Sequence, residues 1–393
     1  MTVYLDHAAT TPVLPAAATA LAEALAAAGN PSSLHASGRA ARRTVEESRE
    51  RLAAALGARP SEVVLTSGGT EADNLAVQGL FRARRAADPR RRRVLVSAVE
   101  HHAVLDPAAW LADHEGAVAV LLPVDGEGVL DLDALHAELA ARPDEVALIS
   151  VMWANNEVGA LQPLADVVDA ARAHGIPVHA DAVQAVGQVP VDFAASGLDA
   201  MTVTAHKVGG PVGIGALLAR RGLPLEPVLH GGGQERGVRS GTLSAPLAAS
   251  FAVAVETAVA ERSSFAARVG ALRDRLVAGV RDTVPGATLR GPDSGRRLPA
   301  NAHLTFAGCE GDSLLYLLDA AGVEVSTGSA CQAGVPEPSH VLLAMGIGED
   351  EARGALRFSF GHTSTDADVD RVLQVLPGVV ERARAAGLVA VHA

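Results

Sequence analysis

The stretch "AMTVTAHKVGG", residues 200–210, joins an apolar, β-branched run to a polar turn that contains Lys207. Lysine and arginine together number 33, and Lys207 is the single lysine among them. A guanidinium cannot be deprotonated at usable pH and so cannot attack a carbonyl, whereas an amine can. We therefore expect Lys207 to perform covalent amine chemistry, such as a Schiff base with an aldehyde cofactor. The alternative is one surface lysine left by a compositional drift toward arginine.

Before this stretch, short apolar runs alternate with alanine-rich helical stretches along the chain. The runs are "EVVLTSG", "RVLVSAVEH", "VALISVMWANNEVG" and "IPVHADAVQ", and the helices between them are predicted over residues 70–85, near 106–114 and over 163–174. This order predicts an α/β core whose central sheet is mostly parallel and covered on both faces. Ligands of such sheets bind beyond the carboxyl ends of the strands, where each run places its polar residues.

A long helical stretch over residues 246–284 separates this core from a second unit. Beyond it, "RLPANAHLTF", "GDSLLYLLDAAG", "VEVSTGSACQAG" and "GALRFSFG" predict a strand, a helix, a strand leading into a loop, and a strand. We therefore expect a large domain of residues 15–258 and a smaller α+β domain formed by residues 1–14 together with 259–393.

Composition excludes several classes of protein. With 49% hydrophobic and 20% charged residues the chain is globular, and its net charge of -12 disfavours direct nucleic-acid binding. The exception is the basic stretch over residues 82–94, which we expect to be a solvated loop before a strand rather than a docking patch for RNA or an acidic partner. The segment "MTVYLDHAATTP" has no basic, apolar leader and no run reaches ~18 apolar residues, so we expect a cytosolic protein without a membrane span.

Neither the cysteines nor the histidines predict a metal site. The two cysteines form no CxxC pair, and the 14 histidines include no HExxH pair. Cys309 lies at a predicted strand-to-helix turn, where we expect a structural role. Cys331 is flanked by glycine and other small residues in "STGSACQAG", which favours an exposed, reactive thiol over a buried apolar one.

Polar residues at the strand ends each allow a chemical role and a structural one. Asp181 could keep a pyridine nitrogen protonated or could cap a helix. Thr70, after Gly69 at a helix start, could bind phosphate or act as a threonine N-cap. His101 could stack on a flat ring or be a polar loop residue. Arg357 could bind a carboxylate through its planar fork or lie at a strand edge.

Eleven motifs in one order resemble a single family, the cysteine desulfurases of the NifS and IscS type. The motifs run from Tyr4 to about His362: "YLDHAATTP", "GNPSSLH", "TSGGTEADN", "VEHHAV", "ANNEVGALQP", "HADAVQ", "TAHKVGGPVGIGAL", "GGGQERGVRSGT", "TGSACQAG", "PSHVLLAMG" and "LRFSFG". The resemblance implies a class V aminotransferase relative with the fold type I of enzymes dependent on pyridoxal 5'-phosphate (PLP), acting as a homodimer. It also implies conversion of L-cysteine to L-alanine, with the sulfur passing to an acceptor protein such as an iron-sulfur scaffold or a tRNA-thiolating enzyme.

The same resemblance assigns the residues that hold the cofactor. Lys207 matches the Schiff-base lysine, Asp181 the partner of the pyridine nitrogen, and Gln184 the ligand of the ring hydroxyl. The residues that match phosphate ligands are Gly69, Thr70, Thr204 and His206. Thr242 matches a phosphate contact that the family supplies from the other subunit. No metal is implied.

The resemblance also assigns the residues that act on the substrate. His101 matches the ring-stacking acid and base, Asn156 and Arg357 match the residues that orient the substrate carboxylate, and Cys331 matches the nucleophile that accepts sulfur as a persulfide. His7 departs from the asparagine of many relatives. A selenocysteine lyase, another PLP-dependent class V aminotransferase relative, or a sulfur-trafficking scaffold without catalysis remain open alternatives. Measuring alanine release from cysteine and from selenocysteine distinguishes a selenocysteine lyase from a cysteine desulfurase.

Overall fold

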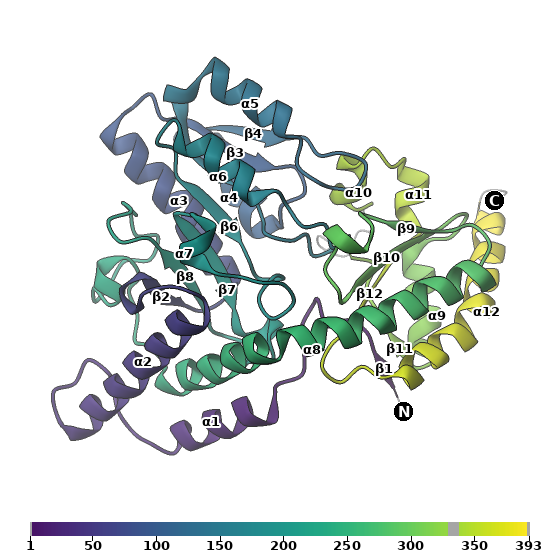
Figure 1. Cartoon of the computed structure of the whole chain (residues 1–393), viewed down its shortest axis with the longest axis horizontal. Coiled ribbons are helices and arrows are strands. Elements are labelled where there is room, and N and C mark those ends of the chain that lie inside the picture. The colour runs from purple at the N-terminus through teal and green to yellow at the C-terminus, as the bar shows by residue number, and fades with distance from the viewer. Residues whose placement is uncertain (1, 329–337, 391–393) are drawn as a thin grey trace.

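The structure is a computed structural model that describes residues 2–328 and 338–390 (Figure 1). Its largest sheet has the strand order β2-β8-β7-β6-β5-β3-β4. The strands are β2 (Val63–Thr66), β3 (Arg93–Ser97), β4 (Val118–Leu122), β5 (Val146–Ser150), β6 (Val178–Asp181), β7 (Ala200–Thr204) and β8 (Gly215–Ala219). Only β8 is antiparallel to its neighbours in this sheet, because the ten residues between β7 and β8 are too few for a crossover. The mostly parallel α/β sheet predicted from the sequence is confirmed.

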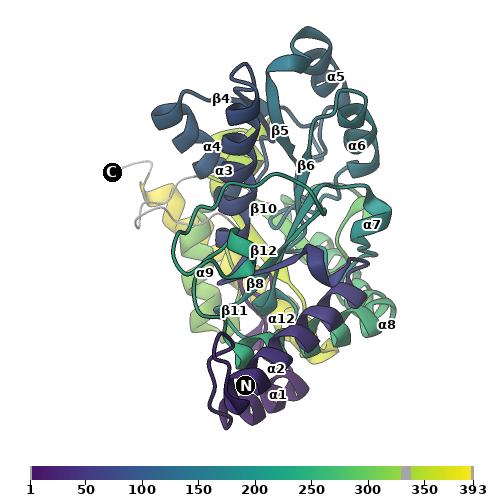
Figure 2. The same cartoon turned by 90° about the vertical axis from the view of Figure 1, so that its left-hand side faces the viewer.

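Helices cover both faces of this sheet. Figure 2 shows α3 and α4 on one side and α6 and α7 on the other. The helices of this part are α1 (Pro15–Leu25), α2 (Ala36–Ala55), α3 (Gly69–Ala87), α4 (His102–Glu115), α5 (Leu132–Ala141), α6 (Leu164–Arg172) and α7 (Phe193–Ser196). Short 3-10 turns lie at η1 (Pro60–Glu62), η2 (Pro143–Glu145), η3 (Ala205–Lys207), η4 (Glu235–Gly237) and η5 (Ser294–Arg296).

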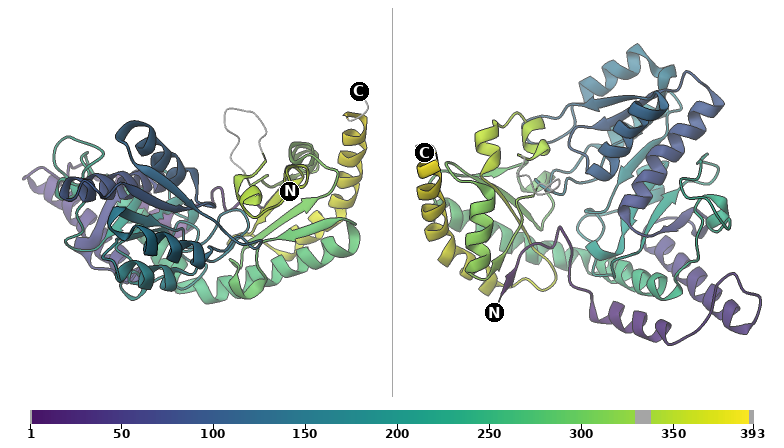
Figure 3. Two further views of the ribbon diagram at one scale, coloured as in Figure 1. Left: turned by 90° about the horizontal axis from the view of Figure 1, so that it is seen from above. Right: turned by 180° about the vertical axis from the view of Figure 1, so that it is seen from behind.

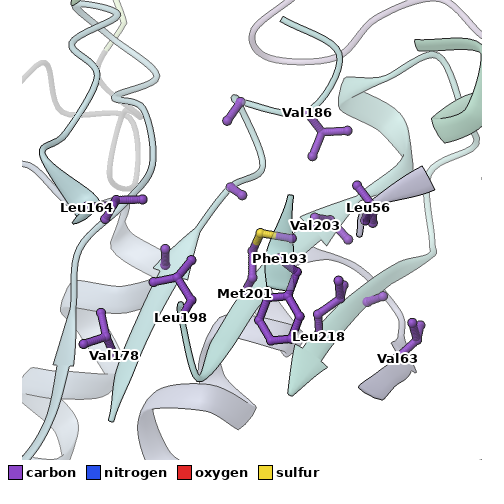
Figure 4. Close-up of a cluster of buried hydrophobic side chains, with 14 of the residues drawn as sticks. Leu56, Val63, Leu164, Val178, Val186, Phe193, Leu198, Met201, Val203 and Leu218 are labelled. Atoms are coloured by element: carbon purple, nitrogen blue, oxygen red, sulfur yellow. The ribbon is translucent and has the colours of Figure 1, made fainter. Parts of the chain in front are cut away.

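The core under α2 and α6 is built from apolar side chains that alternate along the strands. Figure 4 shows Met201 and Leu218 of neighbouring strands beside Phe193. All three are at most 2% exposed, and burying one such side chain stabilises the fold by roughly 1.5–3 kcal/mol. This packing holds β6 and β7, and therefore the residues at their carboxyl ends, in fixed positions.

A second apolar core lies around a three-stranded antiparallel sheet of order β12-β10-β9. The elements of this part are β1 (Val3–Tyr4), α8 (Ala245–Thr283), β9 (Ala287–Arg290), β10 (Asn301–Phe306), α9 (Gly311–Ala320), β11 (Val323–Glu324), α10 (His340–Ala344), α11 (Glu349–Arg353), β12 (Ala355–Ser359) and α12 (Asp366–Ala390). Helix α8 runs from one core to the other (Figures 1 and 3). The N-terminal strand β1 pairs with β11, so Val3 and Leu5 belong to this second core. The division into residues 15–258 and residues 1–14 with 259–393 stays our proposal.

Most predicted helices agree with the structure, but α4 begins earlier than expected. It starts at His102 rather than near residue 106 and contains Pro107 within the helix. Proline disfavours helical geometry in the residue before it, yet Asp106 is helical here. The helix can start earlier because the His101 side chain caps it, with Nδ1 accepting from the Ala103 N–H at 3.1 Å.

The solvated basic loop expected over residues 82–94 is wrong for most of its length. Arg82 lies on α3 and forms an ion pair with Glu115 at 2.7 Å. Arg93 lies in β3, where its side chain is buried and pairs with Glu138 at 2.6 Å. Carboxylates from neighbouring helices thus pair with two of the arginines that the sequence shows as one run. Among the residues described, no helix is both long and apolar enough to span a bilayer.

Candidate active site

Lys207 lies just beyond the carboxyl end of β7, on the 3-10 turn η3. Its Nζ donates hydrogen bonds to the carbonyl oxygens of Ala8 at 2.5 Å and Ala9 at 2.7 Å. Burial, and secondly the charge of Arg357, lower the pKa of Lys207 to about 8. A considerable share of this amine is therefore neutral near physiological pH, as a nucleophilic lysine requires.

The Lys207 amine faces a cavity of about 360 Å³. Because β6, β7 and β5 are parallel, their carboxyl ends meet at this edge of the sheet, as expected for an α/β ligand site. The structure brings together ten of the predicted site residues along its lining: Gly69, Thr70, His101, Asn156, Asp181, Gln184, Thr204, His206, Lys207 and Arg357.

Asp181 is the last residue of β6 and is 6% exposed. Its Oδ1 accepts from the Val183 N–H at 2.8 Å. Burial raises the pKa of Asp181 to about 6, although the Val183 hydrogen bond and the charge of Lys207 oppose the shift. Among the described residues Asp181 has no ion-pair partner within 4.0 Å. A cation placed against this carboxylate from the cavity would relieve the cost of burying it.

The start of α3 forms another wall of the cavity. Its N-cap is Gly68, which has no side chain with which to cap the helix, so the threonine N-cap considered for Thr70 is wrong. The first N–H groups of the helix therefore lack a side-chain cap and suit an anion. A Cβ atom on Gly69 would lie 3.2 Å from Val183 Cγ2, which shows how closely this helix start approaches the turn after Asp181.

His101 is the N-cap of α4 and lines the cavity. Desolvation by the cavity walls, followed by the nearby charge of Lys207, lowers the pKa of His101. Since Nδ1 accepts from the Ala103 N–H, the proton of the neutral ring is on Nε2. His101 can therefore contact a flat ring as a neutral donor.

Arg357 in β12 is 4% exposed and reaches the cavity from the second core. Its Nη1 donates to the Asn156 carbonyl at 3.1 Å, and its Nη2 donates to Asp6 Oδ1 at 2.8 Å. Its Nε is buried and has no hydrogen-bond partner among the described residues. Because Arg357 lines the cavity, the guanidinium N–H groups not used by Asn156 and Asp6 are the donors left for a carboxylate.

One predicted residue that the structure describes is not brought to the cavity, and another is not described. Thr242 is exposed and does not line it, although the role predicted for Thr242 concerns a second subunit. Cys331 lies outside the described residues. Cys309 is 4% exposed with its Sγ 3.8 Å from the Val380 carbonyl, and burial raises the pKa of its thiol, so its structural role is confirmed.

The site also contains groups that sequence reasoning missed. Asp73 is 1% exposed and lines the cavity, and burial together with the charge of Asp181 raises its pKa well above the usual value. It lies one helical turn after Gly69, so helical spacing could have indicated it. The carbonyl oxygens of Ala8 and Ala9 have no sequence signal, because every residue has one.

Comparison with known proteins identifies the family. Residues 3–372 match the family described as aminotransferase class-V. An "IscS-like cysteine desulfurase" of Mycobacterium tuberculosis is 57% identical over 390 residues, which cover 99% of each chain. A "Cysteine desulfurase" of Cereibacter sphaeroides is 44% identical over 98% of this chain and 97% of that protein. A solved structure described as a NifS-like protein has a TM-score of 0.88 and 34% identity, covering 97% of this chain and all of that one.

A mostly parallel α/β sheet with a buried lysine and a buried acid at its carboxyl edge is consistent with a fold type I architecture, which the similarity to the NifS-like structure supports. The chain belongs to the class V aminotransferases and, within them, to the cysteine desulfurases of the NifS and IscS type. The resemblance seen in the sequence motifs is confirmed.

Proposed function

We propose that this chain is a PLP-dependent cysteine desulfurase that converts L-cysteine to L-alanine and retains the sulfur as a persulfide on Cys331. The observation that carries the proposal is the single lysine of the chain, with a pKa lowered to about 8, in one cavity with Asp181 and Arg357. The relatives named above are cysteine desulfurases. A solved structure described as "SspA in complex with cysteine" is 31% identical, with a TM-score of 0.78 over 91% of this chain and 99% of that one.

The residues of the cavity fit PLP in chemical type. An aldehyde requires a neutral amine, which Lys207 provides, and a protonated pyridine nitrogen would give the buried Asp181 the cation that it lacks. Gln184 lines the same cavity as Asp181 and suits the ring hydroxyl. The phosphate would be held at the uncapped start of α3 by Gly69 and Thr70, with Thr204 and His206 beside it and Thr242 from a second subunit. When bound, PLP supplies an electron sink for the electrons left at Cα after deprotonation.

The residues then have separate roles in the reaction of L-cysteine. Arg357 and Asn156, which both line the cavity, bind and orient the α-carboxylate. The Lys207 amine takes the α-proton and returns a proton to the product. The Cys331 thiolate attacks the substrate sulfur, the bond between that sulfur and Cβ breaks with its electron pair going to carbon, and protonation gives L-alanine.

Substitution of the predicted nucleophile tests this assignment. Cys331→Ser should retain the absorbance of bound cofactor and lose the persulfide, and Cys309→Ser is the matched control because Cys309 is buried away from the cavity. Sulfide release by Cys331→Ser at the parent rate would show that the assignment is wrong. Persulfide is measured by mass spectrometry of the peptide, and cofactor by absorbance.

The broader setting is part of the same proposal. We expect a homodimer, because Thr242 is exposed in the single chain and its predicted phosphate lies in the other subunit. We expect a cytosolic enzyme that passes sulfur to an iron-sulfur scaffold or a tRNA-thiolating enzyme. Light scattering tests the first expectation, and transfer of radiolabelled sulfur from Cys331 to captured proteins tests the second.

A further inference from the structure

The charge of Arg357 is balanced by a residue from the N-terminal segment. The Arg357 side chain is 5% exposed, and its guanidinium forms an ion pair with Asp6, whose side chain is 22% exposed. A buried arginine without a counter-ion is strongly destabilising, so this pair is needed for Arg357 to lie where it does. Glu157 is also close enough for Arg357 to affect its pKa, but Glu157 Oε2 accepts from the Ser339 hydroxyl at 2.5 Å.

Asp6 approaches Arg357 from outside the cavity. Arg357 lines the cavity, whereas Asp6 is not among the lining residues. Of the five N–H donors of the guanidinium, one goes to Asp6 and one to the Asn156 carbonyl, and Nε stays without a partner. The carboxylate of Asp6 therefore holds the arginine without taking the place of a ligand in the cavity.

The backbone around Asp6 is itself fixed to the strand that contains Arg357. The Ser359 N–H donates to the Leu5 carbonyl at 2.7 Å, and the Ala8 N–H donates to the Ser359 hydroxyl at 2.9 Å. On the other side, the Asp6 carbonyl accepts from the Ala9 N–H at 3.0 Å. The backbone on both sides of Asp6 is thus held by hydrogen bonds, and the carboxylate itself is held by Arg357.

We propose that Asp6 is the positioning residue for Arg357: it fixes the guanidinium in the cavity wall, so that the N–H donors not used by Asp6 and Asn156 are left for the carboxylate of the amino-acid substrate. This inference rests on the proposed function and deepens it, because it names the residue through which the N-terminal segment sets selectivity for α-carboxylates. Asp6 touches no substrate in this arrangement and acts only through Arg357.

The test compares two non-reacting probes that differ by one carboxylate. Binding of L-alanine and of ethylamine to the holoenzyme is followed by the change in cofactor absorbance, for the parent and for Asp6→Asn. We expect Asp6→Asn to weaken L-alanine binding about tenfold or more and ethylamine binding less than about twofold, with KM for L-cysteine rising and kcat changing little. The control is Asp366→Asn, which removes one partner of the exposed pair with Arg275 and should change neither affinity.

The opposite outcome has a distinct meaning. If Asp6 instead competes with the substrate carboxylate for Arg357, Asp6→Asn binds L-alanine more tightly, and the proposal is overturned. Equal affinity loss for both probes also overturns it, because that pattern reports general damage to the site. Should Asp6→Asn not fold, Asp6→Glu keeps the charge on a longer side chain, and the same selective loss for L-alanine is expected.

A measurement on the apoprotein separates this proposal from the proposed function. Asp6 raises the pKa of Lys207 and Arg357 lowers it. Amine labelling of Lys207 in Asp6→Asn should therefore have its midpoint at a lower pH than in the parent, with no cofactor or turnover needed. An unchanged midpoint overturns the proposed placement of Asp6. Failure of the holoenzyme to form alanine from cysteine, with the labelling shift present, overturns the proposed function alone.

Discussion

Titration of the single lysine offers the most direct test of the site. The pKa of Lys207 falls from 10.5 to about 8, first because of burial and second because of the charge of Arg357. At about 1.36 kcal/mol per pKa unit, this shift corresponds to roughly 3 kcal/mol against the protonated form. At pH 7.5 about a quarter of the amine is then neutral, against about one part in a thousand for an ordinary lysine.

The assay is reductive methylation or acetylation of the apoprotein between pH 6 and 11, followed by peptide mapping. Because Lys207 is the only lysine, the labelled peptide has one source, and the α-amino group at the N-terminus is read from a different peptide. We expect a midpoint near pH 8 in the folded apoprotein and near the ordinary lysine value in the same chain unfolded in urea. The unfolded chain is the matched control, because it contains the same amine without the cavity.

The sign of the effect on stability follows from the same shift. Between about pH 8 and 10.5 the unfolded chain binds the proton that the folded chain has released, so apoprotein stability rises with pH across this window. Below pH 8 the full cost of burying the ammonium group is present. Coincident labelling midpoints in the folded and unfolded chains would refute the reasoning, and with it the view of Lys207 as a nucleophile prepared by its surroundings.

Two further predictions concern buried charge. Glu235 accepts from Arg49 at 2.7 Å with side chains 1% and 7% exposed, so Glu235→Gln should destabilise the apoprotein by about 3–5 kcal/mol in urea denaturation. Glu256→Gln, in a pair that is about 40% exposed, should cost less than ~1 kcal/mol, and equal losses would contradict the argument. The pKa of Asp73 is raised in the folded chain, which therefore keeps a proton that the unfolded chain loses above about pH 4. Stability should accordingly fall as the pH rises above about 4. Asp73→Asn should therefore be more stable than the parent at pH 7, by an amount that shrinks toward pH 4; a less stable variant in thermal denaturation would show that Asp73 is ionised.

Much of the site was predictable because parallel sheets place the carboxyl ends of their strands together. Asp181, Lys207 and Thr204 each follow or end an apolar run in the sequence, and the structure brings all three to one cavity. The polar groups that come from the small sheet were harder to place. Arg357 was recognised through its motif, but the motif does not show that Asp6, 351 positions away in sequence, is its partner.

Errors arose where charge was read without its tertiary partners. The arginines over residues 82–94 look like one exposed patch in the sequence, yet Glu115 and Glu138 reach Arg82 and Arg93 from other elements. The start of α4 was also placed too late, because the side-chain cap from His101 was not foreseen.

The order of strands and helices, the family, and the chemical type of each site residue were determined by the sequence, because apolar periodicity and reactive side chains are properties of the chain itself. The lowered pKa of Lys207, the raised pKa of Asp181 and the pairing of Asp6 with Arg357 were decided only by the tertiary structure. Those properties depend on desolvation and on distances between segments far apart in sequence, and neither exists until the two cores are packed around α8.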